Sequence, residues 1–334
     1  MSLNSKKLTL KTRQEIIRAI RDYFYQIDYL EVQVPLLIRG TNPDAFLTSF
    51  EVFENSDFRG YLTTSTEFQL LRLLSNGFEK VYTLTSNFRA SDKDITHNPE
   101  FTMLEWEAVN VDMRQLEKEV EGLVRMVTGT TGLVEGLRPS IGLRIFEGLN
   151  ETWERLSVHE AFQKYLGLNI TPDFSLVSMV EEIKKVGLEV PTNFLDDRGL
   201  IFSWLIDRIS PNLGATVPTW LYDWPIFQTS MAEPIKENPE VADRSELYIA
   251  GLEIANGFTT VCDATKQRKL FTEQQEERSR QNKKPVVVDE KYLVDLEKGD
   301  LRAAGIALGV DRLVMILTGK KDISEVMAFG WDEI

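Results

Sequence analysis

One stretch of the sequence combines the side chains that phosphate and cation chemistry require. An alternating apolar segment ends at Arg89, a polar loop follows, and a second alternating segment covers residues 100–109. Strand alternation puts these side chains of the second segment on one face: Phe101, Met103, Glu105 and Glu107. This face would present an aromatic plane to a base and two carboxylates to a cation, while Arg89 would bind phosphate or carboxylate. The same pattern is as typical of an edge hairpin whose acidic stripe faces solvent.

A second pair of acids, Glu246 and Glu253, flanks an expected turn at Ala250-Gly251. Carboxylates on adjacent strands could hold Mg²⁺ against polyphosphate oxygens, because Mg²⁺ prefers a few carboxylates together with phosphate. Simple alternation does not put Glu253 and Asn256 on one face, so a β-bulge near Gly257 would be needed. The alternative interpretation is that both acids lie on the surface.

The third feature is the glycine-containing segment from Gly305 to Arg312, which predicts a strand that runs into a helix. Glycine lets backbone approach a ligand closely, and a helix N-terminus favours anions. Arg312, one turn into that helix, could reach a polyphosphate. A packing glycine and a surface arginine are the alternative.

Hydrophobic periodicity predicts the elements that must position these residues. Amphipathic or solvated helices are expected at 12–28, 65–76, 113–127, 265–284 and about 310–317, and a less regular helical pattern covers 156–209. Strands are expected at 31–35, 80–88, 100–109, 220–224, 245–250 and 252–262. Strands and helices mix without regular βαβ alternation, which predicts an α+β fold on a mostly antiparallel sheet.

Composition narrows the classes of function. The 38 basic and 52 acidic residues give a net charge of −14, which disfavours tight binding of nucleic acid such as tRNA. No apolar run approaches the roughly 20 residues of a membrane span, and the N-terminus does not resemble a signal peptide. Cys262 is the one cysteine, so no internal disulfide can form, which favours a reducing cytoplasm. One cysteine and two histidines, His97 and His159, disfavour a structural zinc site.

Together, these segments resemble the three signature motifs of class II aminoacyl-tRNA synthetases. Residues 12–35 resemble the dimer-forming first motif, residues 88–105 the second, and residues 305–312 the third. The strings HNPEFTMLEW, GLEIANGF and ALGVDRLVM are similar to the lysyl branch. The first motif begins almost at the N-terminus, before which a lysyl-tRNA synthetase has an anticodon-binding domain of about 100 residues, a common domain size. The chain therefore resembles the elongation factor P–lysine ligase family, a truncated paralogue, and Ala307 also matches that family.

The resemblance implies a class II synthetase catalytic domain, an antiparallel sheet flanked by helices. We expect residues 1–334 to form one such domain, with a helical insertion at about 150–215 and no anticodon-binding domain. A homodimer through helix 12–28 and the strand after it is also implied.

The resemblance also implies roles for individual residues, with Arg89 and Arg312 as the catalytic groups on phosphate. Residues implied to bind ATP are Arg89, Ser91, His97, Asn98, Phe101, Glu246, Leu247, Gly309 and Arg312. Residues implied to line the amino-acid pocket are Ser65, Thr66, Glu67, Glu105, Glu107, Glu253, Asn256, Thr260 and Ala307. Glu67 would bind the α-amine, and Glu246 with Glu253 would hold Mg²⁺.

Three positions depart from the family pattern. Thr260 stands where the family has a glutamate that pairs with the side-chain ammonium, and Glu107 stands where it has a tyrosine. Ser91 replaces a glutamate near ATP, which puts adenine recognition in doubt. We therefore predict a cationic amino acid whose amine is placed differently, such as β-lysine, ornithine or a shorter diamino acid.

The implied activity is ATP-dependent formation of an aminoacyl-adenylate and transfer to a lysine of elongation factor P. One alternative is a ligase that joins the activated amino acid to a small molecule or another acceptor that is not tRNA. A second alternative is a non-catalytic sensor of amino acid or ATP. Retention of Arg89, Glu246, Glu253 and Arg312 disfavours the sensor.

Overall fold

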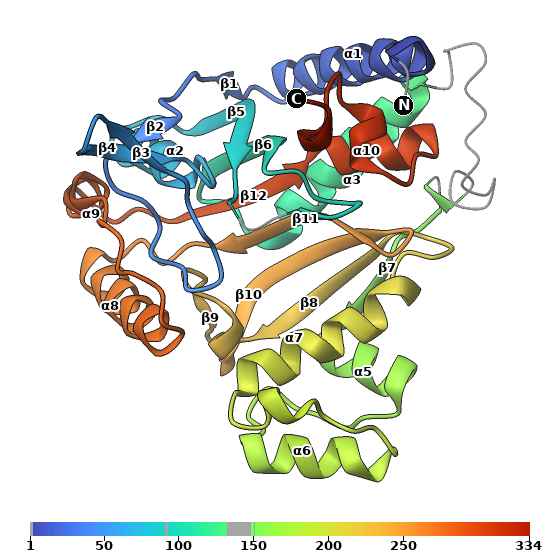
Figure 1. Cartoon of the computed structure of the whole chain (residues 1–334), viewed down its shortest axis with the longest axis vertical. Helices are drawn as coiled ribbons and strands as arrows, with labels where there is room; N and C mark the ends of the chain where they lie inside the picture. Colours follow the sequence, from blue (N-terminus) through green and yellow to red (C-terminus); the bar gives the residue numbers. More distant parts are fainter. Residues whose placement is uncertain (1–2, 91–92, 132–147, 150) are drawn as a thin grey trace. The chain divides into compact units, whose positions relative to one another are not determined.

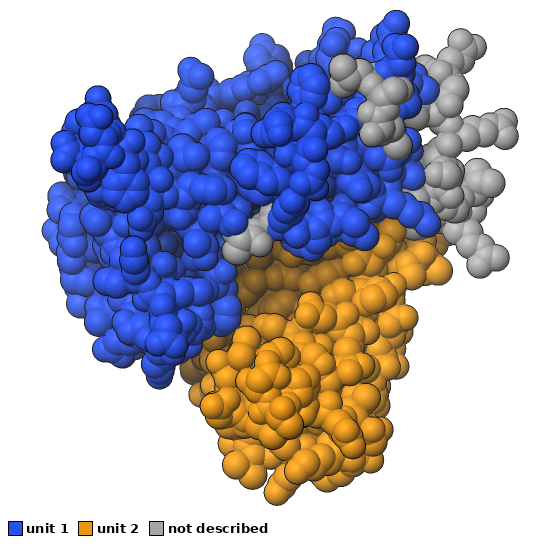
Figure 2. All heavy atoms as spheres, in the orientation of Figure 1, with its two compact units in different colours: residues 1–141, 259–334 blue, residues 142–258 orange. Residues whose placement is uncertain are grey.

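The computed structural model describes residues 3–90, 93–131, 148–149 and 151–334 (Figure 1). The chain forms two compact units, which Figure 2 shows in different colours. Unit 1 contains residues 1–141 and 259–334, and unit 2 contains residues 142–258. Ser91 lies outside the described residues, as does part of the predicted 150–215 insertion at residue 150.

The strands of unit 1 build a sheet in the order β1-β5-β6-β12. Their bounds are Leu30–Glu31 for β1, Lys80–Phe88 for β5, Glu100–Val109 for β6 and Ala303–Gly309 for β12. Strand β1 pairs with β5 in parallel, whereas β5 with β6 and β6 with β12 are antiparallel. A smaller antiparallel sheet has the order β2-β4-β3, with bounds Leu37–Ile38, Asp57–Leu62 and Glu51–Glu54.

Helices pack on this sheet and on one another. The described helices of unit 1 are α1 (Leu3–Gln26), α2 (Glu67–Leu74), α3 (Met113–Thr131), α8 (Ala264–Arg280), α9 (Glu290–Leu296), α10 (Val310–Thr318) and the short η4 (Ile323–Val326) and η5 (Trp331–Glu333). Helix α2 contacts β5, β6 and α9, while α1 packs against α3 and α10. The apolar stripe of α1 is fully buried at Ile16, Ile20 and Phe24, as its spacing predicts.

Unit 2 has its own strands and helices. Its strands have the order β11-β10-β8-β7, and β9 pairs with β10. Their bounds are Leu252–Thr259 (β11), Asn238–Ile249 (β10), Thr219–Pro225 (β8), Glu154–Ser157 (β7) and Pro234–Ile235 (β9). The helices are α5 (Val158–Leu166), α6 (Leu176–Lys185), α7 (Arg198–Ile209) and the short η1 (Thr192–Phe194), η2 (Ser210–Asn212) and η3 (Ile226–Gln228).

A hydrophobic core of unit 2 joins α5, α6 and α7 to β8 and β10. Phe162, Phe202 and Trp224 contribute large rings to it. Capping residues define where these helices begin: Ser157 forms a capping box with Glu160 at the start of α5, and Asp197 caps α7. The interpretation of residues 150–215 as an insertion within one domain stays a prediction.

The predicted α+β fold with mostly antiparallel pairing is confirmed. Strands β5 and β6 have the predicted bounds. The predicted strand 31–35 is wrong in extent, because β1 covers only Leu30–Glu31 and one further bond joins Val32 N to Tyr82 O at 2.9 Å. Pro35 has no N–H with which to continue a ladder. Helix α9 lies in a segment for which the periodicity predicted no element.

Candidate active site

Glu105 and Glu107 lie on an internal strand of unit 1. In the register, Glu105 is opposite Thr83 of β5 and Ala307 of β12, and Glu107 is opposite Val81 and Gly305. Both glutamates are buried, each with 4% exposure. The alternative of an edge hairpin with a solvent-facing acidic stripe is therefore wrong, because β6 is covered by a strand on each side and the acidic face is enclosed.

Glu105 is held by hydroxyl and amide groups at the start of α2. Its Oε1 accepts a hydrogen bond from Ser65 Oγ at 2.5 Å, and its Oε2 accepts from the backbone N of Thr66 at 2.5 Å. The Thr66 hydroxyl also bonds Glu105 and lies 2.6 Å from the Thr83 hydroxyl, so it does not cap α2. Burial raises the pKa of Glu105, while these hydrogen bonds lower it in part. The carboxylate is thereby fixed in one position.

Glu67 and Glu107 differ from Glu105, because each has a buried carboxylate oxygen without a hydrogen-bond partner among the described residues. Burial, and then the nearby Glu105, raise the pKa of Glu67 to about 8. Burial, then Glu67 and then Glu105, raise the pKa of Glu107 well above its usual value. Clustered buried acids are unfavourable unless a cation joins them. The cluster therefore has free acceptors for an ammonium group, whose positive charge would favour the ionised form of these acids.

The position of Glu107 depends on Gly305. A Cβ at residue 305 would lie 1.8 Å from Glu107 Oε1 and 2.0 Å from its Cδ. The glutamate carboxyl thus occupies the space above a residue without a side chain. Sequence reasoning placed Gly305 in the third motif for backbone approach to a ligand, and the structure shows that it makes room for an acid.

Thr260 is also buried near this sheet. Its backbone N donates to Ala303 O at 2.9 Å, next to the start of β12. Its hydroxyl is buried and has no partner among the residues described. Thr260 therefore contributes an unused hydroxyl at the position where the resemblance implies a carboxylate.

Arg89 and Phe101 come together at the end of the β5–β6 hairpin. The Arg89 guanidinium carbon lies 5.2 Å from the centre of the Phe101 ring, within cation–π range. The backbone N of Arg89 donates to Pro99 O at 2.9 Å, which extends the pairing beyond the two strands. An arginine and an aromatic face are therefore adjacent, and their binding of a nucleotide stays a prediction.

Arg312 lies against the loop that carries His97. Arg312 Nη2 is 2.5 Å from His97 Nε2, and His97 Nδ1 is 2.9 Å from Asp94. A guanidinium can only donate, so Nε2 must accept and the imidazole proton lies on Nδ1, toward Asp94. Hydrogen bonds from Thr96 and His97 outweigh burial and lower the pKa of Asp94 to about 2. Asp94 and His97 thus orient the guanidinium.

Neighbouring contacts fix the start of α10 and the loop. Gly309 is the last residue of β12, opposite Met103, and precedes α10. Asp311 is buried and accepts from Arg13 of α1 at 2.5 Å and from Thr102 N at 2.6 Å. Asn98 donates to Glu100 O at 2.7 Å and accepts from Trp331 N at 2.9 Å. The second and third motif segments are therefore tied together within unit 1.

In unit 2, a bulge on β11 brings the predicted polar residues to one face. Glu246 is opposite Asn256, and Tyr248 is opposite Glu253, so Ile254 is the extra residue. Glu246, Glu253 and Asn256 consequently share one face of β10 and β11, while Leu247 is fully buried on the other. A bulge was predicted, but its predicted position near Gly257 is wrong. Local alternation cannot show where a register shifts.

Glu246 is not a surface acid, because it is 4% exposed and has partners on both oxygens. It accepts from Arg244 Nη2 at 2.6 Å and from the Tyr248 hydroxyl at 2.7 Å. Burial, and then Glu253, raise the pKa of Glu246 to about 7. Arg244 also donates to Asn256 Oδ1 at 3.2 Å. Sequence reasoning missed Arg244 and Tyr248, although strand alternation around Glu246 could have indicated them.

The structure thus gathers most of the predicted residues in two groups, each within its own unit. The first group of unit 1 contains acids and hydroxyls together with the facing Ala307: Ser65, Thr66, Glu67, Glu105 and Glu107. The residues predicted to bind ATP lie on the second and third motif segments of the same unit: Arg89, His97, Asn98, Phe101, Gly309 and Arg312. In the part of the chain that is described, no cluster of three or more His, Cys, Asp or Glu residues has the arrangement of a metal site. None of the described helices has the length and apolar character to cross a membrane.

Comparison with known proteins adds the following. The family model described as tRNA synthetases class II (D, K and N) matches residues 1–333. An elongation factor P–(R)-beta-lysine ligase of Pseudoalteromonas translucida (strain TAC 125) is 33% identical over 335 residues, covering 96% of this chain and 94% of that protein. A protein of the same name from Avibacterium paragallinarum is 33% identical, covering 96% of this chain and 95% of that protein. Another from Pectobacterium carotovorum subsp. carotovorum (strain PC1) is also 33% identical, covering 96% of this chain and 94% of that protein.

Proposed function

The chain belongs to the elongation factor P–(R)-beta-lysine ligase family of class II synthetases, and from this premise we propose that it activates a cationic amino acid with ATP and transfers it to a lysine of elongation factor P. The substrate carboxylate attacks the α-phosphorus of ATP, and pyrophosphate leaves. The amine of the acceptor lysine then attacks the carbonyl carbon of the adenylate, so an amide forms and AMP leaves with the release of one proton. Cleavage of ATP to AMP and pyrophosphate overall provides the free energy for forming the adenylate and then the amide.

The observation that carries this proposal is the buried acid cluster of unit 1. Glu67 and Glu107 have buried oxygens without partners among the described residues, and Glu105 is fixed beside them. A primary ammonium has three donors and one positive charge, so it would satisfy such acceptors and offset the repulsion among the acids. A neutral side chain would do neither, which favours lysine, β-lysine or a related diamino acid.

The arginines provide the second part of the mechanism. Arg89 and Arg312 would bind the α-phosphate and meet the charge that develops there, and Phe101 would pack on adenine. The contact from His97 to Arg312 would hold that guanidinium in place before ATP binds. No covalent intermediate on the protein is needed, so positioning and electrostatics supply the catalysis.

Glu246 and Glu253 of unit 2 would supply carboxylates for Mg²⁺, and Glu246 would then give up its hydrogen bond from Arg244. Glu246 and Glu253 share a face, and two carboxylates with phosphate oxygens are a common environment for this ion. These residues would hold it, and the ion would neutralise phosphate charge. A homodimer through α1 and location in the cytoplasm belong to the same proposal, and tRNA is not the expected acceptor.

The test has two steps. Amino-acid-dependent exchange between ATP and pyrophosphate is measured with lysine, both β-lysine enantiomers, ornithine, diaminopropionate, aspartate and norleucine. The best substrate is then incubated with ATP and purified elongation factor P, and the mass of the acceptor is measured. Exchange with one cationic amino acid and an added aminoacyl mass are expected. Preferential use of norleucine would refute the cationic substrate, and transfer only to small amines would favour the other ligase reaction.

A further inference from the structure

Helix α9 contributes an aromatic residue, Tyr292, that the sequence motifs did not single out. Its side chain is fully buried. The ring stacks on Phe68 with a centre-to-centre distance of 4.2 Å and an interplanar angle of 4°. Phe68 directly follows Glu67 at the start of α2, so this stacking joins Tyr292 to the helix that carries one acid of the cluster.

The hydroxyl of Tyr292 has no hydrogen-bond partner among the described residues. Burial raises the pKa of Tyr292 well above its usual value, and then Glu67, Cys262, Glu107 and Asp289 raise it further. Leaving a buried hydroxyl unpaired is unfavourable, whereas phenylalanine would give the same stacking without that cost. A ligand that reaches this hydroxyl would offset the cost of leaving it unpaired.

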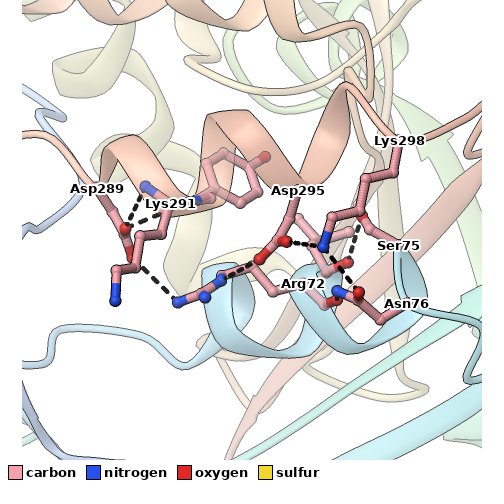
Figure 3. Close-up of polar contacts among 9 residues, drawn as sticks. Arg72, Ser75, Asn76, Asp289, Lys291, Asp295 and Lys298 are labelled. Atoms are coloured by element: carbon pink, nitrogen blue, oxygen red, sulfur yellow. Dashed lines mark hydrogen bonds and ion pairs between the residues drawn. The ribbon is translucent and has the colours of Figure 1, made fainter.

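A polar cluster holds α9 against α2 (Figure 3). Arg72 of α2 donates from Nε to Asp295 of α9 at 2.6 Å. Lys298 donates to Asp295 at 2.5 Å and to Asn76 at 2.8 Å. Asp289 caps α9 by accepting from the backbone N of Lys291 and of Tyr292. The helix that carries Tyr292 is thus fixed to the helix that carries Glu67.

We propose that Tyr292 determines substrate specificity, with its hydroxyl accepting a hydrogen bond from an ammonium group that Glu67 and Glu107 bind. The hydroxyl adds an acceptor without adding a fourth negative charge to the cluster. It also limits where the ammonium can lie, since the ring cannot move without losing its stacking on Phe68. This inference rests on the proposed function, and it names a residue that the family motifs do not contain.

The experiment compares Tyr292→Phe with the wild-type chain in amino-acid-dependent ATP–pyrophosphate exchange. We expect the KM for the diamino acid to rise about tenfold, the effect of losing one hydrogen bond to a charged group. The KM for ATP should not change, and the melting temperature without substrate should be equal or higher. The matched control is Tyr165→Phe on α5, outside the cluster, which should change neither KM.

An unchanged KM for the diamino acid in Tyr292→Phe, with active wild-type protein, would overturn the inference and leave the proposed function intact. If the wild-type chain exchanges with no amino acid, the proposed function fails. Binding of lysine and β-lysine is then measured by calorimetry. Binding that Tyr292→Phe weakens about tenfold would still support the ammonium contact, and no binding to the wild-type chain would refute it.

Discussion

The two units each bury carboxylates, but they stabilise them differently. In unit 2, Glu246 has a positive partner from its own chain, since Arg244 lies 2.6 Å away, and Tyr248 completes its hydrogen bonds. In unit 1, Glu105 has hydroxyl and amide partners and the positive charge of Arg89 nearby, whereas Glu67 and Glu107 each keep a buried oxygen without a partner among the described residues. Burial raises the pKa in both places. The comparison indicates that Glu246 of unit 2 is compensated within its own chain, whereas Glu67 and Glu107 of unit 1 have acceptors left for a cationic ligand.

The largest effect is expected where the internal partner is removed. Arg244→Met leaves Glu246 buried without its counter-charge, which should lower the free energy of unfolding by about 3 kcal/mol. Denaturant unfolding at pH 8 is the measurement, because Glu246, whose pKa is about 7, is then mostly ionised. The matched control is Arg268→Met, which breaks an exposed pair with Glu290 and should cost less than about 1 kcal/mol. Equal losses in the two variants would refute internal compensation.

Removing an acid from unit 1 should lower activity without lowering the free energy of unfolding. Glu107→Gln is expected to lower kcat/KM for the diamino acid about a hundredfold, because a charged contact to the ammonium is lost. Its stability without substrate should be unchanged or higher, since burial and the neighbouring acids disfavour the ionised carboxylate and the amide is always neutral. Exchange kinetics and thermal unfolding check both statements. A stable variant with wild-type kinetics would show that Glu107 does not bind substrate.

Gly305→Ala tests whether the position of the Glu107 carboxyl matters, because it displaces this carboxyl and leaves its charge in place. The new Cβ would lie 1.8 Å from the present position of Glu107 Oε1, so the carboxyl must shift. We expect the KM for the diamino acid to rise about tenfold, as for one lost charged hydrogen bond, and the KM for ATP to stay constant. Gly299→Ala is the control, because its Cβ would meet no atom within 4 Å. A constant KM in Gly305→Ala would show that the position of Glu107 is not critical.

The stability of the chain without substrate should also depend on pH. The pKa of Glu67 rises from 4.5 to about 8 on folding, so between these values the folded chain holds a proton that the unfolded chain has lost. The stabilisation is fully present below about pH 4.5 and is lost as the pH rises toward 8. Thermal unfolding without substrate should show this decline, and Glu67→Gln should reduce it. An identical pH profile in Glu67→Gln would assign the decline to other groups.

Much of the fold could be predicted because its signals are local. The bounds of β5 and β6 followed from alternating apolar and polar residues between polar loops. The shared face of Glu105 and Glu107 followed from the same alternation, because every second residue of a strand points to the same face. The buried stripe of α1 followed from helical spacing. Arg89 and Phe101 were predicted as the phosphate-binding and base-binding groups of one hairpin, and their direct contact is a finding of the structure.

The amino-acid sequence by itself therefore determined most of the element types and the shared face of Glu105 and Glu107, because alternation and helical spacing depend on neighbouring residues, and its motif strings indicated the family. Only the tertiary structure decided that β6 is internal, that the bulge falls at Ile254, and that Glu107 fits above Gly305. It also decided that Tyr292 stacks beside Glu67, although 225 positions separate the two, since 292 − 67 = 225. Burial and partnership depend on residues far apart in the chain, so no local pattern contains them, and they set the electrostatics of the site.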